Sequence, residues 1–302
     1  MAEIKWALWN CSGILPSSST QTKMDFLNSC NNTNFDILVL IETHHKDFAE
    51  ISSLLHTYTS NSSIVQTEAT EDDPYAGIVV LINNKFTLLE DTELLQGRLL
   101  NFKIQCYKKV YNITAMYGYT GKNASQEKME QMTAYLEQHH NISDNNIILG
   151  DFNFVENDLD RTNKSRSGKN QMDKTLSKPW CEFTEKTGLS DPFRVRNPKR
   201  RAFSYIHTKD KAKSRIDRIY VNDENCNELI SYKHVPTISC KTHKMVTFSL
   251  KEECERGPGF WKMNTSILRD RAYETLVEHT ANDVLSFLLK QLLSIQRHIV
   301  QK

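Results

Sequence analysis

The 302-residue chain lacks the features that most quickly assign a sequence to a class. Its seven cysteines are widely spaced and form no Cys-x-x-Cys pair, which argues against a zinc knuckle and favours a reducing compartment. No apolar run approaches the roughly 20 residues of a membrane-spanning helix. The first residues lack the charged-then-apolar pattern of a signal peptide, and no internal repeat is visible. These absences favour a globular protein that does not engage a membrane.

An excess of charge of one sign is also lacking, since the formal net charge is +1. The distribution is uneven, however. The segment from Arg161 to Arg218 holds 17 Lys+Arg against 6 Asp+Glu, a local net charge of +11 that leaves −10 for the rest of the chain. A basic segment in an otherwise acidic chain suggests a polyanionic partner, although a solvated loop is the commoner origin of such a segment.

Apolar patterns along the chain predict many strands and few long helices. Alternating or continuous aliphatic runs predict strands over residues 4–10, 36–43, 76–83, 98–107, 109–119, 145–153, 214–221 and 243–250. Apolar residues at helical spacing predict helices over residues 23–30 and 125–140, the second with Ser125 as its N-cap. The pattern therefore favours a layered α/β fold that contains two packed sheets.

The character of the sequence changes after Leu250. Residues 251–259 are charged and then break at Gly-Pro-Gly, which predicts a linker. From Arg271 onward the pattern predicts a helix with one apolar face that needs a partner surface. The apolar positions of this helix are Leu276, Val284, Phe287, Leu288, Leu292, Ile295 and Ile299. We therefore expect a folded domain over residues 1–252 and a linker with a helical segment over residues 253–302.

The stretch IILGDFNFVEND, from Ile147 to Asp158, raises the question of function. A predicted core strand ends there in a carboxylate, Asp151, and a carboxamide, Asn153. Such residues are common in polar turns, but the carboxyl ends of core strands are also where layered α/β folds bind ligands. Other predicted strands carry similar polar residues at or near their ends. These residues are Asn10, Glu42, Tyr117, Asp217 and His243.

Side chains of these types suit the hydrolysis of a phosphate ester. Carboxylate and carbonyl oxygens are the ligands that Mg²⁺ accepts, usually with only one or two carboxylates. A histidine held by an aspartate can orient water or stabilise charge. Amides and phenols can donate hydrogen bonds to phosphoryl oxygens as negative charge develops on them. A repeated polar strand end therefore favours a reaction site over a set of unrelated turns.

Five motifs, WNCSG, LVLIET, AMYGY, LGDFNFV and SRIDRIYV, resemble in order those of the endonuclease/exonuclease/phosphatase superfamily. The resemblance covers residues 4–250 and implies a four-layered α/β sandwich, with two packed mixed β-sheets flanked by helices. Within the superfamily, the chain looks most like the apurinic-like endonuclease domain of non-LTR (LINE-type) retrotransposons. The basic loop before Ser-Arg-Ile-Asp supports that likeness. So does GFWKMNTSILRDRAYETL, which resembles the segment joining endonuclease to reverse transcriptase in such polyproteins.

The resemblance implies a role for each matching residue. Glu42 would hold a Mg²⁺ ion with Asn10 beside it, and Asp151 would activate or position the attacking water. The other catalytic residues would be Asn153, Tyr117 and His243, which contact the phosphate, and Asp217, which hydrogen-bonds the histidine. Contacts to DNA would come from Ser204, Tyr205, Lys199, Arg200, Arg201 and Arg215.

One position departs from the superfamily's pattern. Where the superfamily usually has Ser-Asp-His before the last strand, this chain has Lys241-Thr242-His243, so a neutral threonine replaces an acid near the metal. Glu42 can suffice as the direct ligand because Mg²⁺ keeps much of its water. We therefore expect an active enzyme with a higher Mg²⁺ requirement than an aspartate-bearing relative.

The resemblance implies an endonuclease that nicks one strand of double-stranded DNA and leaves a 3′-hydroxyl to prime reverse transcription. Its cofactor would be Mg²⁺, for which Mn²⁺ can substitute. Its other partners would be the element RNA and a reverse transcriptase domain of the same polyprotein, with synthesis in the cytoplasm and action in the nucleus. The alternatives are a repair enzyme for abasic sites, a phosphatase or phospholipase of the same superfamily, and a DNA-binding module that has lost catalysis.

Two smaller alternatives concern single residues. Tyr119 competes with Tyr117 for the phosphate contact, and we favour Tyr117. His44 and His45 follow Glu42 directly and suggest a zinc site. Because adjacent strand residues point to opposite faces, the two histidines cannot easily bind one ion, and we reject that site.

Overall fold

The computed structural model describes residues 2–13, 20–31, 35–49, 52, 55, 62–106, 108–141, 144–162, 167–237, 240–252, 275 and 278–286. By its internal contacts the chain divides into two units, Met1–Cys254 and Glu255–Lys302. In the second unit residues 278–286 are helical, and the Val284 predicted for the apolar face is 53% exposed. The predicted linker at residues 253–259 and the other predicted apolar positions of the tail lie outside the described residues.

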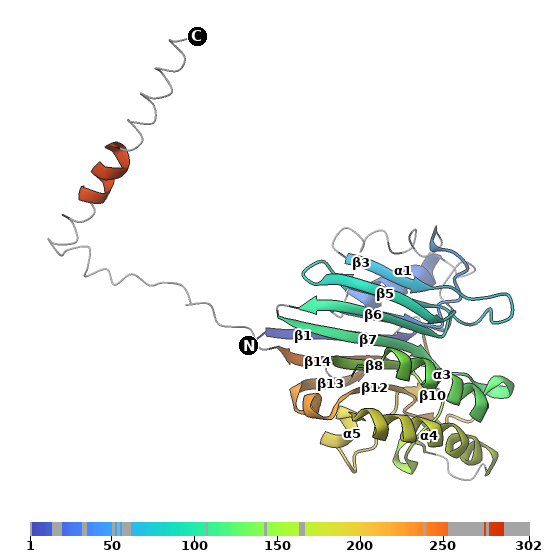
Figure 1. Ribbon diagram of the computed structural model, residues 1–302. Coiled ribbons are helices and arrows are strands. Elements are labelled where there is room, and N and C mark those ends of the chain that lie inside the picture. Colours follow the sequence, from blue (N-terminus) through green and yellow to red (C-terminus); the bar gives the residue numbers. More distant parts are fainter. Residues whose placement is uncertain are drawn as a thin grey trace. The chain divides into compact units, whose positions relative to one another are not determined.

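The first unit is built on two six-stranded mixed sheets (Figure 1). Sheet A has the order β13 (Leu229–Val235), β14 (Met245–Glu252), β1 (Ala2–Asn10), β2 (Ile37–Ile41), β4 (Ile78–Asn83) and β3 (Ser62–Thr67). Sheet B has the order β5 (Thr87–Leu95), β6 (Leu99–Cys106), β7 (Lys109–Tyr117), β8 (Asn145–Asp151), β12 (Asp217–Asn222) and β9 (Leu189–Ser190). The pairs β1–β2 and β7–β8 are parallel, and the other neighbours are antiparallel. A separate two-stranded ribbon joins β10 (Tyr205–Ile206) and β11 (Lys213–Ser214).

Helices lie against the outer faces of the sheets. They are α1 (Thr20–Asn31), α3 (Gln126–His139) and α4 (Ser167–Thr187). The short helix α5 (Pro192–Arg196) packs instead through Phe193 on Tyr232 of β13. Three short 3₁₀ turns are η1 (Gly121–Asn123), η2 (Asp158–Asp160) and η3 (Asp223–Glu228). As predicted, Ser125 caps α3, since its side chain accepts a hydrogen bond from the Lys128 backbone N–H. In Figure 1, α3 and α4 lie beside each other.

Alternation along the strands divides the apolar core into layers. Inward residues of both sheets, such as Trp6 of β1 and Phe102 of β6, form one cluster between the sheets. Outward residues of sheet A pack with Phe26 of α1. Outward residues of sheet B pack with Met132 of α3 and Trp180 of α4. The order helix, sheet, sheet, helix is the predicted four-layered α/β sandwich, which is thereby confirmed.

Several strands and helices of the structure were not predicted. Two of them, β5 and α4, have sequences that do not show the usual apolar pattern of their element type. The strand β5 lies at the edge of sheet B with most of its side chains exposed, so it lacks the apolar alternation of a half-buried strand. The helix α4 lies inside the basic segment and contains Pro179, which ordinarily argues against a helix interior. The strands β3 and β13 were also missed. Across the described ranges, no helix combines the length and apolar character that crossing a membrane requires.

Candidate active site

Sheet B aligns three of the predicted site residues at neighbouring strand ends. The register places Asp151 of β8 opposite Tyr117 of β7 on one side and Asp217 of β12 on the other. Gly150 comes just before Asp151, and a Cβ there would lie 1.9 Å from the carbonyl oxygen of Met116. The glycine in the Gly-Asp-Phe-Asn motif is therefore required by the close approach of two backbones. Asp151 and Asp217 are almost completely buried.

Sheet A supplies a second group of polar residues. Asn10 ends β1 and pairs with Ile41 of β2, so it lies beside Glu42, which follows directly. The Asn10 Nδ2 donates to Glu42 Oε2 at 2.8 Å and to Asp151 Oδ2 at 2.8 Å. Its Oδ1 accepts a hydrogen bond from the Ser12 backbone N–H at 3.0 Å. One buried carboxamide thus joins carboxylates delivered by the two different sheets.

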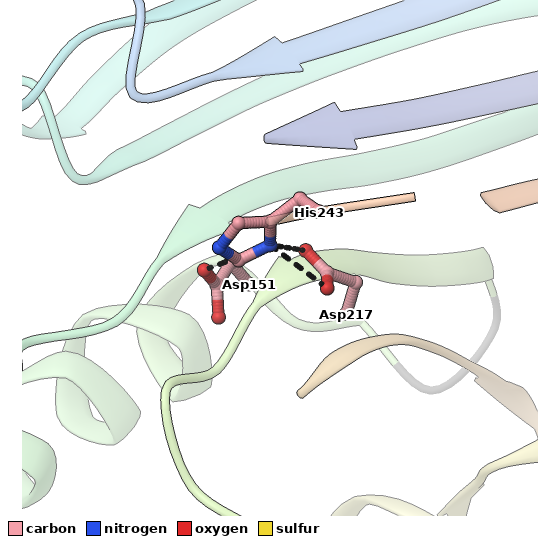
Figure 2. A group of neighbouring side chains, drawn as sticks. All are labelled: Asp151, Asp217 and His243. Atoms are coloured by element: carbon pink, nitrogen blue, oxygen red, sulfur yellow. Dashed lines mark hydrogen bonds and ion pairs between the residues drawn. The ribbon is translucent and has the colours of Figure 1, made fainter. Parts of the chain in front are cut away.

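His243 lies two residues before β14 of sheet A, and its side chain lies against the acids of sheet B. Figure 2 shows its ring between Asp217 and Asp151, with Nδ1 at 3.2 Å from Asp217 Oδ2 and 3.9 Å from Asp151 Oδ2. Burial alone would lower the pKa of His243, but the charges of Asp217 and Asp151 outweigh it and raise that pKa to about 9. The imidazole is therefore held as a cation near neutral pH.

The pKa values of Glu42 and Asp151, the two carboxylates joined by Asn10, are shifted in opposite directions. Burial, with the charge of Asp217, raises the pKa of Asp151 to about 7, against hydrogen bonds from Asn10 and Asn153 and the charge of His243. Partial burial acts to raise the pKa of Glu42, but hydrogen bonds from His44 and Asn10 outweigh it and lower that pKa. Asp151 thus titrates near neutrality and suits a proton-accepting role, whereas Glu42 stays ionised.

The backbone around these residues is strained. Among the described non-glycine residues with positive φ are Ser12 (50°), Glu42 (57°), His44 (59°) and Asn153 (59°), all in or beside the pocket. Such conformations persist only where surrounding bonds over-determine them, and they concentrate at functional sites. Asn153 illustrates the restraint, since its N–H donates to Asp151 Oδ1 at 2.9 Å and its Nδ2 donates to the Gly118 carbonyl at 2.8 Å.

The strand ends open into a pocket with a volume of about 550 Å³. Predicted residues that line it are Glu42, Tyr117, Asn153, Tyr205, Thr242 and His243. The structure adds Ser12, Arg161 and Met172, which sequence reasoning missed. Arg161 is the first residue of the basic segment, and that position was the one sequence signal that could have singled it out. Its guanidinium is held by Asp173 at 2.8 Å.

The fit of a divalent cation depends on which acids remain ionised and unpaired. Among the described residues, Asp151, Asp217 and His243 place ligand atoms within 4.8 Å of one another. The cationic imidazole lies between the two acids. The three residues are therefore better described as an ion-paired triad than as a metal site. Glu42 fits a metal better, because it is ionised, partly exposed and faces the pocket. Asn10 is adjacent, although its amide N–H, not its oxygen, faces the acids.

The two histidines after Glu42 lie beyond the end of β2 at Ile41, so the strand alternation used to reject a zinc site does not apply to them. His44 Nε2 lies 3.5 Å from Glu42 Oε1, whereas His45 is fully buried with Nδ1 at 2.6 Å from Thr43 Oγ1. The two imidazoles therefore do not converge on one ion. Tyr117 lines the pocket and hydrogen-bonds Glu42, while Tyr119 packs outside it against Arg98 and Lys128. This geometry favours Tyr117 over Tyr119, as the sequence did.

Two residues predicted to touch DNA are buried instead. Arg215 is 1% exposed, and its guanidinium binds Asp160 through Nε at 2.8 Å and Asp191 through Nη1 at 2.6 Å. Ser204 is fully buried, and its Oγ accepts hydrogen bonds from the backbone N–H groups of Ile216 and Asp217. The prediction that these two residues contact DNA is therefore wrong. The polar atoms of both side chains bind other groups of the protein inside the fold. Their role here is to hold the strand that starts at Asp217.

The other predicted DNA-contacting residues are accessible. Lys199, Arg200 and Arg201 are all exposed on the connection between α5 and β10. Arg201 is partly engaged, since its Nη2 donates to the Arg161 carbonyl at 2.6 Å. The Tyr205 ring lies at the pocket with its centroid 4.7 Å from that of His243.

Thr242 also lines the pocket. The sequence predicted a position near the metal for it, because it replaces the aspartate of the Ser-Asp-His pattern. Its Oγ1 lies 3.4 Å from the Sγ of buried Cys240. The backbone carbonyl of Thr242 accepts a hydrogen bond from the Ile206 N–H at 2.8 Å, which ties this segment to the β10–β11 ribbon. The threonine is therefore well placed to influence the pocket, but it brings no charge there.

Comparison with known proteins agrees with this architecture. A curated relative, the Transposon TX1 uncharacterized 149 kDa protein of Xenopus laevis, is 28% identical over 214 residues, which are 68% of this chain and 15% of that protein. The AP endonuclease LMAP of Leishmania major superposes with a TM-score of 0.66 at 16% identity, covering 83% of this chain and 88% of the other. The 3′-5′ exonuclease NExo of Neisseria meningitidis superposes with a TM-score of 0.61 at 16% identity, covering 82% and 100%.

The two structural matches share the fold while their names describe different nucleases, so the fold alone does not select an activity. The model of the endonuclease/exonuclease/phosphatase family matches residues 7–235. That span includes every strand of sheet B, together with Asn10, Glu42 and the Asp217 end of β12. The chain belongs to the endonuclease/exonuclease/phosphatase family.

Proposed function

We propose that this chain is a Mg²⁺-dependent endonuclease domain that nicks one strand of double-stranded DNA and leaves a 3′-hydroxyl. The observation that supports it most is the pocket itself, where both His243 and an ionised Glu42 belong to the lining and the buried acids Asp217 and Asp151 lie directly behind His243. The pocket is thus lined by a cation and by an acid fit to hold a metal, and the proton-accepting Asp151 lies next to both through His243 and Asn10. This arrangement suits attack of water on a phosphodiester.

Each side chain has a defined task in this proposal. Asp151 accepts a proton from the attacking water, because its pKa lies near neutrality. His243 presents positive charge to the phosphoryl oxygens, and the Tyr117 hydroxyl can donate to the same group. Mg²⁺, held by Glu42 with Asn10 beside it, would neutralise charge on the phosphate and the leaving oxygen. Mn²⁺ can take its place.

DNA as the substrate is supported by the exposed cations beside the pocket. Lys199 and Arg200 carry charges without a counter-ion among the ion pairs of the described residues, and a 550 Å³ pocket that is open to solvent admits a backbone segment. The likeness to a transposon protein supports a role for the nick in priming reverse transcription by a domain of the same polyprotein. Such a protein would be made in the cytoplasm and act with its element RNA in the nucleus.

The decisive experiment compares three substrates under one set of conditions: an intact duplex, a duplex with a single abasic site, and a duplex ending in a 3′-phosphate. We expect Mg²⁺-dependent nicks in the intact duplex whose ends a DNA polymerase can extend. Preference for the abasic duplex would replace the proposal with a repair activity, which the names of the structural neighbours favour. Activity confined to the 3′-phosphate would replace it with a phosphatase. DNA binding without cleavage of any substrate would indicate a degenerate module.

A further inference from the structure

A buried arginine lies behind the pocket and has no place in the mechanism above. Arg98 is 4% exposed and sits between β5 and β6. Its Nε donates to Asp73 Oδ2 at 2.7 Å, and its Nη2 lies 2.6 Å from the same oxygen. Its Nη1 donates to the carbonyls of Tyr117 at 3.3 Å and Gly118 at 2.9 Å. This guanidinium is therefore saturated inside the protein and cannot reach a DNA phosphate.

The flat face of the same guanidinium lies on aromatic rings. Its central carbon is 4.2 Å from the ring centroid of Tyr117 and 4.6 Å from that of Tyr119. The Tyr117 N–H also donates to the Arg98 carbonyl at 2.8 Å. Tyr117 is thus held by Arg98 at its N–H, its carbonyl and its ring, while its hydroxyl extends to Glu42. Lysine could not reproduce this, because it lacks the planar fork.

The partner of Arg98 belongs to the loop that supports Glu42. The Asp73 carbonyl accepts a hydrogen bond from the Ala76 N–H at 3.1 Å, and the Ala76 carbonyl accepts one from the His44 N–H at 3.0 Å. His44 in turn lies 3.5 Å from the Glu42 carboxylate. One arginine therefore connects the Glu42 side of the pocket, in sheet A, with the Tyr117 side, in sheet B.

We propose that Arg98 is a positioning residue, which through its pairing with Asp73 and its stacking on Tyr117 holds the Tyr117 hydroxyl in place relative to Glu42. The inference rests on the proposed function and adds to it a residue that never touches the substrate. Because small misplacement of a reacting group can cost a large factor in rate, the effect should appear in kcat and hardly in KM.

The test is a double-mutant cycle on nicking by the full chain. Arg98→Lys is expected to lower kcat by roughly 10- to 100-fold with KM changed by less than about 3-fold. In the Tyr117→Phe background the same substitution is expected to cost less than about 3-fold, because an effect that acts through the hydroxyl disappears with it. Equal losses in both backgrounds, or no loss in wild type, would overturn the proposal.

Two further arms separate positioning from loss of stability. Asp73→Asn keeps the shape of the partner and is expected to show the same pattern in a milder form. Lys109→Ala removes the 3.1 Å ion pair with Glu228 at the other end of β7, and it should leave kcat unchanged. If Lys109→Ala lowers kcat as much as Arg98→Lys, general weakening of sheet B explains both and the proposal fails.

A readout without catalysis distinguishes failure of this inference from failure of the proposed function. In protein labelled with 3-fluorotyrosine, the Tyr117 resonance is assigned by its loss in Tyr117→Phe. Arg98→Lys should shift or broaden that resonance in the absence of DNA and metal. If the resonance shifts but the protein cleaves no substrate, the positioning role of Arg98 is supported and the proposed nuclease activity is wrong. An unmoved resonance would overturn the positioning role, whatever the activity.

Discussion

The two sheets contribute to the pocket in different ways. Sheet B places two acids, Asp151 and Asp217, opposite each other on paired strands, and both are almost fully buried. Sheet A supplies what these acids need, namely the cationic ring of His243 and the N–H groups of Asn10. A buried acid pair without compensation would be strongly unfavourable. The raised pKa of Asp151 shows that compensation is incomplete.

The difference teaches that the reactive arrangement belongs to the interface between the sheets. Packing the sheets together yields a carboxylate that titrates near neutrality beside a histidine that stays charged. Substitutions on either side should therefore change the behaviour of the other. Four predictions follow, on sheet B, on the pair between the sheets, on a connection outside both sheets and on the sheet A side.

The largest effect is expected in sheet B. Asp151→Ala should lower the nicking rate by about 10³-fold, within the range found for removal of a general base, while DNA affinity stays nearly unchanged. The reason is that Asp151 acts on water and not on the DNA backbone. Rates are measured on supercoiled plasmid and affinity by titration of labelled duplex. The exposed Asp158 offers a matched control, and nicking by Asp151→Ala near the wild-type rate would show the assignment to be wrong.

The second prediction concerns the pH dependence of nicking, which depends on residues from both sheets. Wild-type nicking should rise through pH of about 7 as Asp151 loses its proton, and fall through about 9 as His243 loses its own. The charge of Asp217 raises both pKa values, so Asp217→Asn should move both limbs to lower pH and reduce the maximum by about 10²-fold. The profile of kcat/KM for both proteins is the measurement, and limbs that stay in place would break the link between the sheets.

The third prediction concerns the connection between α5 and β10, which belongs to neither sheet. Replacing Lys199, Arg200 and Arg201 with Ala should weaken binding to all DNA sequences and leave kcat little changed. Each lost phosphate contact should also reduce the log–log salt slope by about 0.9. Arg201 should contribute least, because part of its guanidinium binds the Arg161 carbonyl. An unchanged slope would mean that the run faces solvent.

The smallest effect is expected on the sheet A side, at Thr242. Thr242→Asp places a carboxylate at a position of the pocket wall that now has only a hydroxyl. The Mg²⁺ concentration for half-maximal nicking should therefore fall several-fold. The saturated rate should change much less. The added charge should also raise the pKa of His243 and shift the alkaline limb upward. If wild type never cleaves at any metal concentration while Thr242→Asp does, the chain is a degenerate domain.

The core strands and the site residues could be predicted because their signals are local. A run such as residues 37–41 is apolar at every position, since β2 is buried on both faces. The polar residue at each strand end then stands out against it. Edge strand β5 and helix α4 could not be predicted in the same way, because their patterns depend on which neighbours cover them.

The sequence by itself indicated a layered α/β fold with two packed sheets and the residues at the strand ends, because the alternation and termination of strands are written in consecutive residues. The four layers were implied by the resemblance of five motifs to a known superfamily. Tertiary structure alone decided which cations face solvent. Arg215 and Lys199 belong to one basic segment and were both predicted to contact DNA, yet the first is enclosed by Asp160 and Asp191 and the second is exposed. It also decided that Arg98 reaches Asp73 and Tyr117 together. Burial and pairing across distant segments arise only when the sheets pack, so no local pattern records them.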